Sequence, residues 1–130
     1  MIKRIQHSHH RALDRNLAPL GLSLVQWNAL REIERYPGCS QHLLAERTFN
    51  SDQAMGTLLN RLREGGLVER QGGMGRATSH ALTDKGKALL RDGQGVMSAL
   101  TTASFMVLND TEKLALVALL TKVVDNLAEL

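Results

Sequence analysis

Apolar residues recur every three to four positions through most of this 130-residue chain, which is the pattern of amphipathic helices. Ser, Thr or Asn precedes several of these stretches, and Pro or Gly follows several, as expected of helix ends. Together these signals predict six helices, over residues 3–18, 24–35, 41–47, 51–64, 84–107 and from 110 to near the C-terminus. The predicted fold class is therefore mainly α.

The spacing changes after Gly65-Gly66, a pair that predicts the end of a helix. Leu67–Gln71 and Arg76–Leu82 are short and strand-like, on either side of the glycine-rich tip Gly72–Gly75. This arrangement predicts a two-stranded hairpin. The region from Ser40 to Leu82 thus has the order helix, turn, helix, hairpin, which is that of a winged helix-turn-helix.

In a helix-turn-helix the second helix enters the major groove of DNA and the first braces it. The bracing requires apolar residues on the shared side, and those predicted to face inward are Leu43, Leu44, Phe49, Met55, Leu58 and Leu62. Those predicted to face outward are Ser51, Asp52, Gln53, Ala54, Thr57, Asn60 and Arg61. Gln pairs with adenine, Ala and Thr contact the thymine methyl, and Arg reaches phosphate. This face is the predicted DNA-reading surface.

The last predicted helix carries a wide apolar stripe, formed by Leu114, Val117, Leu120, Val124 and Leu127 and widened by Leu116, Leu119 and Val123. A terminal helix has few neighbours in its own chain, so we interpret the stripe as a two-chain interface shared with the first helix. The alternative is a helix packed between neighbours of the same chain. On the first interpretation residues 1–22 and 84–130 form a helical dimerisation region, and residues 23–83 form the DNA-binding lobe.

The amino-acid composition further limits the fold class and the kinds of site that the chain can contain. Hydrophobic residues make up 43% of the chain and aromatic residues only 3%, which favours an aliphatic core of packed helices. The net charge of +3 agrees with a phosphate-rich partner but is weak evidence for one. The single Cys39 excludes an internal disulfide and a multi-thiolate metal site. No apolar run reaches membrane-spanning length, so we expect a cytoplasmic protein without membrane contact.

The histidines and the cysteine are candidates for metal binding and for redox sensing. His7 and His10 share a helix face, but no acid or Cys nearby in the sequence completes a metal site, and a solvated helix is favoured. His42 and His80 are further candidates to approach Cys39, although His80 is better interpreted as a satisfied, semi-buried side chain. A helix N-terminus next to Cys39 would lower its thiol pKa, which keeps redox sensing open. We expect no bound cofactor and no metal. We also expect no enzymatic activity, because the Ser and His residues form no nucleophile–base pattern.

With these elements in place, the sequence resembles the multiple-antibiotic-resistance-regulator (MarR) family of winged-helix repressors. The resemblance covers nearly the whole chain and is carried by the runs Leu24–Leu30, Pro37–Ser40, Leu62–Arg70, Arg76-Ala77 and Leu82–Gly86. It implies a homodimer joined by terminal helices, a recognition helix at 51–63 and a wing arginine, Arg76, that enters the minor groove. It also implies a pocket for a small aromatic or phenolic effector, with Trp27 and Arg31 as candidate lining residues.

The predicted function is therefore a homodimeric repressor that binds double-stranded DNA at a pseudo-palindromic operator and is released by a small-molecule effector. The residues expected to contact DNA are Ser40, Ser51, Gln53, Ala54, Thr57, Asn60, Arg61, Arg63, Arg70 and Arg76. Met74 stands where the family usually has Asp, and Asp52 stands where many members have a basic residue. The alternatives are thus a winged-helix ligand- or protein-binding module with weakened DNA affinity, or a metal- or redox-responsive regulator.

Overall fold

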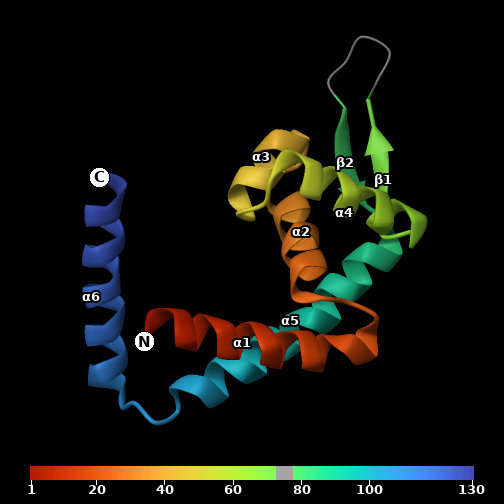
Figure 1. The fold of residues 1–130 in the computed structure, drawn as a ribbon. Coiled ribbons are helices and arrows are strands. Elements are labelled where there is room, and N and C mark those ends of the chain that lie inside the picture. The colour runs from red at the N-terminus through yellow and green to blue at the C-terminus, as the bar shows by residue number, and fades with distance from the viewer. Residues whose placement is uncertain (73–77) are drawn as a thin grey trace. The chain divides into compact units, whose positions relative to one another are not determined.

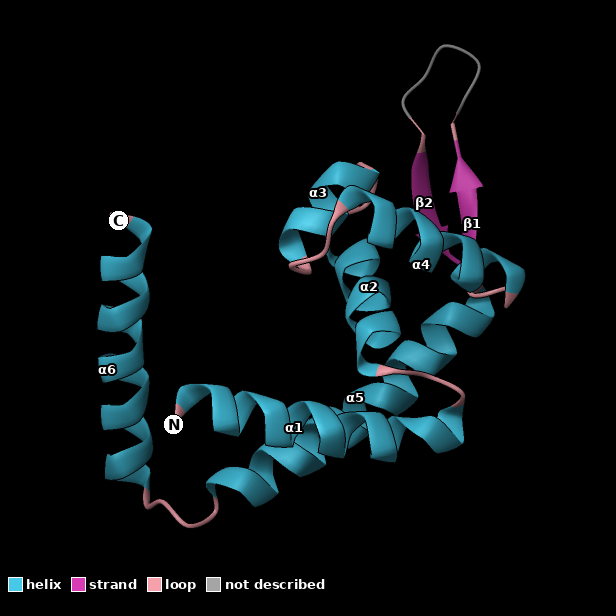
Figure 2. Cartoon of the chain, viewed as in Figure 1, coloured by secondary structure: helices cyan, strands magenta, loops and turns pink. Residues whose placement is uncertain are grey.

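The computed structural model describes residues 1–72 and 78–130, so Met74 and Arg76 lie outside the described residues. Six α-helices and one antiparallel hairpin are present in the described part of the chain, as the apolar spacing predicted (Figures 1 and 2). The elements are α1 (Ile2–Leu17), a short 3₁₀ turn η1 (Ala18–Leu20), α2 (Leu24–Arg35), α3 (Gln41–Arg47), α4 (Asp52–Glu64), β1 (Val68–Gln71), β2 (Ser79–Leu82), α5 (Asp84–Phe105) and α6 (Asp110–Ala128).

Side-chain caps determine where the helices begin. The Ser23 hydroxyl accepts a hydrogen bond from the Gln26 amide, and the Gln26 side chain accepts one from the Ser23 amide. Asp14 adds a third acceptor for the start of α2, because its Oδ1 lies 2.7 Å from the Leu24 nitrogen. These bonds satisfy amides that the helix itself leaves without partners.

The chain divides into two compact units, residues 1–97 and 98–130, with the boundary inside α5. The first unit holds the hydrophobic core, in which α2 packs against α1, α3 and β2, and α4 packs against α3 and β1. Its largest fully buried side chains are Trp27, Leu17, Leu30, Leu44, Met55, Leu59 and Leu62. Trp27 is the only aromatic residue among them, which agrees with the aliphatic core expected from composition.

The hairpin is anchored to the core at its base. Val68 pairs with Leu82 and both are buried, whereas Arg70 pairs with His80 farther along the hairpin. The start of α5 passes so close to Leu67, the residue directly before β1, that a Cβ on Gly86 would lie 2.1 Å from the Leu67 carbonyl oxygen. Only glycine permits this approach, so the wing and α5 are held together by backbone contact.

The second unit contains the end of α5 and the whole of α6. Every residue of α6 is exposed except Leu116, which is half-buried. Leu114, Val117 and Leu120 are 46–74% exposed, so the unit itself leaves the predicted apolar stripe uncovered. Among the described residues, no helix has the length and apolarity needed to cross a bilayer.

Two apolar residues predicted to face inward are exposed instead. Leu43 is 36% exposed, and Phe49 is 97% exposed. In the short helix α3 only Leu44 and Ala45 reach the core, which leaves Leu43 at the surface. Phe49 has a positive φ of 58°, which a bulky side chain rarely adopts, and this turn directs the ring outward. The bracing contact between α3 and α4 is therefore made by fewer residues than predicted.

Candidate nucleic-acid interface

The site begins with two serines that start its two helices. The Ser40 hydroxyl accepts a hydrogen bond from the Leu43 amide at the start of α3. The Ser51 hydroxyl accepts one from the Ala54 amide at the start of α4. Both serines are exposed but are committed to N-capping, which orients the two helices at the surface.

The turn between the helices is closed by its own polar side chains. Thr48 donates its hydroxyl hydrogen to the Leu44 carbonyl at 2.7 Å, and the Asn50 amide nitrogen donates to the Thr48 hydroxyl at 2.9 Å. The Asn50 backbone amide also bonds to the Ala45 carbonyl. These bonds define the direction in which α4 leaves α3.

Helix α4 has one buried and one exposed side. Met55, Leu59 and Leu62 are between 0 and 1% exposed and attach the helix to the core. The opposite side presents short polar or small side chains, and its exposed members are Gln53, Ala54, Thr57, Asn60 and Arg61. The structure thus brings together five of the residues predicted to contact DNA on one solvent-facing surface.

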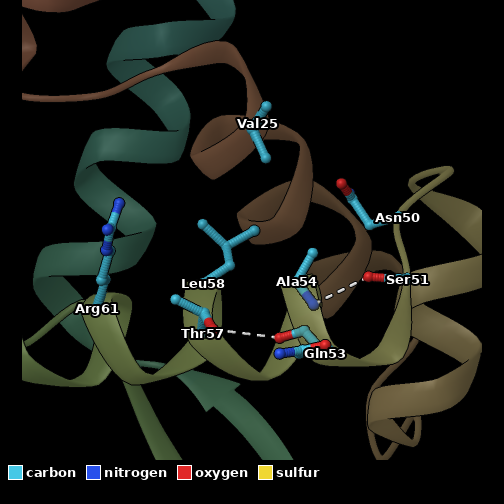
Figure 3. A pocket seen from close by; sticks show the side chains of 8 residues that line it. All are labelled: Val25, Asn50, Ser51, Gln53, Ala54, Thr57, Leu58 and Arg61. Carbon is cyan, nitrogen blue, oxygen red and sulfur yellow. Dashed lines mark hydrogen bonds between the residues drawn. The ribbon is translucent and has the colours of Figure 1, made fainter.

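A groove of about 510 Å³ runs along one flank of this surface. Figure 3 shows Val25 of α2 on the far side of the groove from α4, with Arg61 near one end and Ser51 near the other. The Thr57 hydroxyl donates to the Gln53 carbonyl at 3.2 Å, so these two residues lie on the same line of the helix. The lining residues are Val25, Asn50, Ser51, Gln53, Ala54, Thr57, Leu58 and Arg61.

Arg63 is turned toward the hairpin instead of the exposed face of α4. Its guanidinium donates to His80 Nε2 at 2.8 Å and to the Asn60 side chain. Arginine has no acceptor, so Nε2 must be unprotonated and the ring hydrogen sits on Nδ1. His80 is only 4% exposed, and its Nδ1 has no partner in the described part of the chain, so the prediction of a satisfied, semi-buried histidine is only partly right.

One further predicted DNA contact lies on the hairpin. Arg70 is exposed on β1 and pairs in register with His80. Burial of His80 lowers its pKa below 6.5, and the positive charges of Arg63 and Arg70 lower it further. Arg76, the predicted wing arginine, lies outside the described residues.

Asp52, the first residue of α4, is paired with a histidine of α3. His42 Nδ1 lies 2.9 Å from Asp52 Oδ1, and its Nε2 lies 3.1 Å from Glu46 Oε1. The hydrogen bond that His42 donates to Asp52, and then the charges of Asp52 and Glu46, raise the His42 pKa above 6.5. Sequence reasoning missed this pair, because residues ten apart on two different helices share no periodic signal.

Cys39 does not have the environment predicted for it. The side chain is buried and its thiol contacts the Ser40 carbonyl oxygen at 3.6 Å. Burial raises the pKa of the thiol, an effect that the nearby Arg47 only partly opposes and Glu32 reinforces. The expectation of a lowered pKa is therefore wrong, because loss of hydration on burial is the largest influence on the pKa of this thiol.

Trp27 was expected to line an effector pocket but is a core residue. Its ring is 1% exposed, and Nε1 donates to the Leu90 carbonyl at 3.1 Å. The Arg31 guanidinium stacks over the same ring at 5.3 Å from its centroid and bonds to Glu32 at 3.3 Å. A bound molecule would have to displace α5 to reach the indole.

A different cavity, of about 440 Å³, lies between α1, α2 and the turn that precedes α4. It combines apolar side chains with half-buried imidazoles, and His10 is 3.2 Å from the Asp14 carboxylate. The lining residues are Gln6, His9, His10, Leu13, Leu24, Val25, Asn28, Thr48, Phe49 and Asn50. The volume falls within the range of small-molecule sites.

The sequence of this chain is similar to those of known transcriptional regulators. Residues 20–77 match a model described as MarR family. The HTH-type transcriptional repressor Rv2887 of Mycobacterium tuberculosis is 36% identical over 85 residues, which cover 64% of this chain. The match spans 61% of the length of that repressor.

Solved structures match over almost the whole chain. Rv2887 in complex with salicylic acid is 28% identical, with a TM-score of 0.77 over 94% of this chain and 92% of that one. A MepR–DNA complex from S. aureus is 19% identical, with a TM-score of 0.84 over 97% and 93%. A mutant MarR from E. coli complexed with operator DNA is 24% identical, with a TM-score of 0.84 over 94% and 89%. The last two likenesses concern the fold.

Proposed function

We propose that this chain is a member of the MarR family of winged helix-turn-helix proteins and that it is a DNA-binding transcriptional regulator. It acts in the cytoplasm as a homodimeric repressor of a pseudo-palindromic operator, and its role is regulation, not catalysis. The proposal rests on one observation above the others. The outer side of α4 carries exposed side chains suited to base edges and phosphates, on a helix whose inner side is fully buried.

Each exposed residue of α4 has a role in this proposal. Gln53 reads an adenine edge, Thr57 contacts a thymine methyl, and Arg61 binds a phosphate. In a two-fold symmetric dimer the two copies of α4 enter successive major grooves, about 34 Å apart. Arg70 and Arg76 of the wing add contacts beside the groove, and basic side chains favour a narrow minor groove.

The proposed effector is a small aromatic acid or phenol. Rv2887 has been solved with salicylic acid and with p-aminosalicylic acid, which supports this class of ligand. We propose the cavity between α1, α2 and the turn before α4 as its site, in place of Trp27. His9 and His10 supply donors for an anionic group, and Phe49 and Leu13 supply apolar contact. Because Asn50 and Thr48 line the same cavity, an occupant there acts on the turn that directs α4.

The test is a fluorescence-anisotropy titration with labelled duplexes from the DNA upstream of the chain's own coding sequence. Arg61→Ala should weaken binding roughly tenfold and reduce the slope of log K against log salt by about one. Gln53→Ala should weaken binding by about 1–3 kcal/mol on the preferred duplex and less on unrelated DNA. Arg91→Ala, an exposed arginine of α5, is the charge-matched control.

Two results would argue against the proposal. If no upstream duplex binds at low salt, the chain is a ligand- or protein-binding module on a winged-helix scaffold. If Arg61→Ala and Arg91→Ala lower affinity equally, α4 is not the DNA-reading helix.

A further inference from the structure

The contact between α3 and α4 contains a histidine held between two carboxylates. His42 Nδ1 lies 2.9 Å and 3.1 Å from the two oxygens of Asp52, and Nε2 lies 3.1 Å from Glu46. A carboxylate accepts hydrogen bonds but cannot donate them. A neutral imidazole has one N–H and one acceptor, so it satisfies only one of the two carboxylates. Only the doubly protonated imidazolium satisfies both.

The position of this cluster connects it to the surface that reads DNA. Asp52 is the first residue of α4 and immediately precedes Gln53, so its carboxylate stands beside the proposed base contacts. Gln41 of α3 also donates to the Asp52 carbonyl oxygen at 3.1 Å, and a Cβ on Gly56 would lie 3.1 Å from the same Gln41 nitrogen. The first turn of α4 is therefore held against α3 by contacts that converge on Asp52.

The net charge of this cluster affects DNA binding. When His42 is neutral, the cluster of His42, Asp52 and Glu46 has a net charge of −2. When His42 is protonated, the net charge of the cluster is −1. Phosphates repel uncompensated carboxylates, so protonation of His42 favours approach of the duplex. It also holds the Asp52 side chain toward α3 and away from the outer side of α4.

We propose that His42 is a positioning residue of the DNA interface, whose protonation holds and neutralises Asp52 and thereby makes DNA affinity dependent on pH. The inference rests on the proposed DNA-binding function. Among the described residues, the charged groups facing His42 are Glu46 from its own helix and Asp52 from α4. Both are acidic and both favour the protonated ring.

The direction of the effect follows from these contacts. Because Asp52 and Glu46 raise the pKa of His42 above 6.5, the ring stays protonated to higher pH than an ordinary histidine does. His42 donates to both carboxylates at pH values below this raised pKa, and one of the two contacts is lost as the pH increases through it. DNA affinity should fall over the same interval, by roughly two- to fivefold for an exposed cluster of this kind.

The experiment compares DNA affinity from pH 5.5 to 8.5 at constant ionic strength, using fluorescence anisotropy and the upstream duplex. The variants are His42→Gln and Asp52→Asn, with His7→Gln, an exposed histidine of α1, as the control. Wild type and His7→Gln should lose affinity with rising pH. His42→Gln should lose this dependence and bind at all pH values as the wild type does at high pH. Asp52→Asn should bind more tightly at high pH and vary little.

A histidine NMR titration of the free protein provides a readout that does not involve DNA. The His42 resonance should titrate above pH 6.5 in the wild type and shift to lower pH in Asp52→Asn. Tight binding with the same pH profile in all four proteins overturns the role of His42 and leaves the proposed function standing. Equal loss of affinity for His42→Gln at every pH also overturns it, because that result indicates a purely structural residue. Absence of binding at every pH overturns both.

Discussion

The backbone of Gly93 lies directly against the indole ring of Trp27, and a Cβ built on Gly93 would be 2.3 Å from Cδ1 of the ring and 2.4 Å from Nε1. The same helix also fixes the ring by a hydrogen bond, because Nε1 donates to the backbone carbonyl of Leu90, three residues earlier in α5. The Leu90 carbonyl and the bare backbone of Gly93 thus form a socket for Trp27. The socket attaches α5 to the helix-turn-helix through α2.

The contact predicts unequal effects of two alanine substitutions in α5. Gly93→Ala should destabilise the fold by about 1–3 kcal/mol, because the buried indole has no room to move away from a methyl group. Gly95→Ala, with nothing within 4 Å, should stabilise it by about 0.5–1 kcal/mol through helix propensity. Urea denaturation followed by circular dichroism measures both. Equal effects of the two substitutions would show that the socket is not tight.

The sequence predicted the elements well because their signals are local. Ser23 and Ser40 mark helix starts by each capping the amide three residues further on, and the helices 24–35 and 41–47 have the predicted bounds. The hairpin was likewise predicted by a change of period around glycines. The exposed side of α4 followed from the opposite buried side, because helix geometry relates the two.

Features that depend on contacts between elements were not predictable in this way. The role of Gly93 is determined by Trp27, 66 positions earlier in the chain, and no local pattern around Gly93 indicates that contact. The outward position of Phe49 depends on a left-handed backbone that no periodic pattern marks. The pKa of Cys39 was misjudged because a helix start is visible in the sequence and burial at a loop junction is not.

The exposed stripe of α6 predicts that the chain is a dimer in solution. Leu120→Glu should shift the protein toward the mass of one chain, 14.3 kDa, because a carboxylate in an apolar interface carries a large desolvation cost. Lys122→Glu changes charge on the same helix outside the stripe and should leave the dimer intact. Light scattering coupled to size-exclusion chromatography measures the mass. A monomeric wild type at micromolar concentration would contradict the interface.

Substitution of Phe49 by Asn is expected to increase the stability of the fold and to weaken effector binding. Phe49→Asn should raise the free energy of unfolding by about 1 kcal/mol, because Asn adopts the left-handed φ of 58° with less strain than Phe. The same change should weaken binding of salicylic acid, measured by calorimetry, since an aromatic wall of the proposed cavity is lost. Phe49→Val also removes the ring but keeps the backbone strain, so it should weaken binding without stabilising the fold. Stabilisation by Val as well would refute the strain argument.

Cys39 should react slowly in the folded protein. Because burial raises its pKa, little thiolate is present at neutral pH, and the buried sulfur is shielded from reagents. We expect a chromogenic disulfide reagent at pH 7 to modify the native thiol at least about tenfold more slowly than the urea-unfolded thiol. Rapid modification of the native protein at pH 7 would instead support the redox-sensing alternative.

His80 predicts that stability decreases in mild acid. Its folded-state pKa is lowered, first by burial and then by Arg63 and Arg70, so its contribution to stability is present above pH 6.5, the ordinary histidine value, and is lost as the pH falls below it. Protonation also places an N–H against the Arg63 guanidinium, which requires Nε2 as an acceptor. Urea denaturation of the wild type and of His80→Gln between pH 5 and 8 isolates this contribution, because glutamine retains an acceptor but does not titrate. The wild type should lose stability relative to His80→Gln as the pH falls, whereas a constant difference between the two proteins would mean that His80 titrates alike in the folded and unfolded chains.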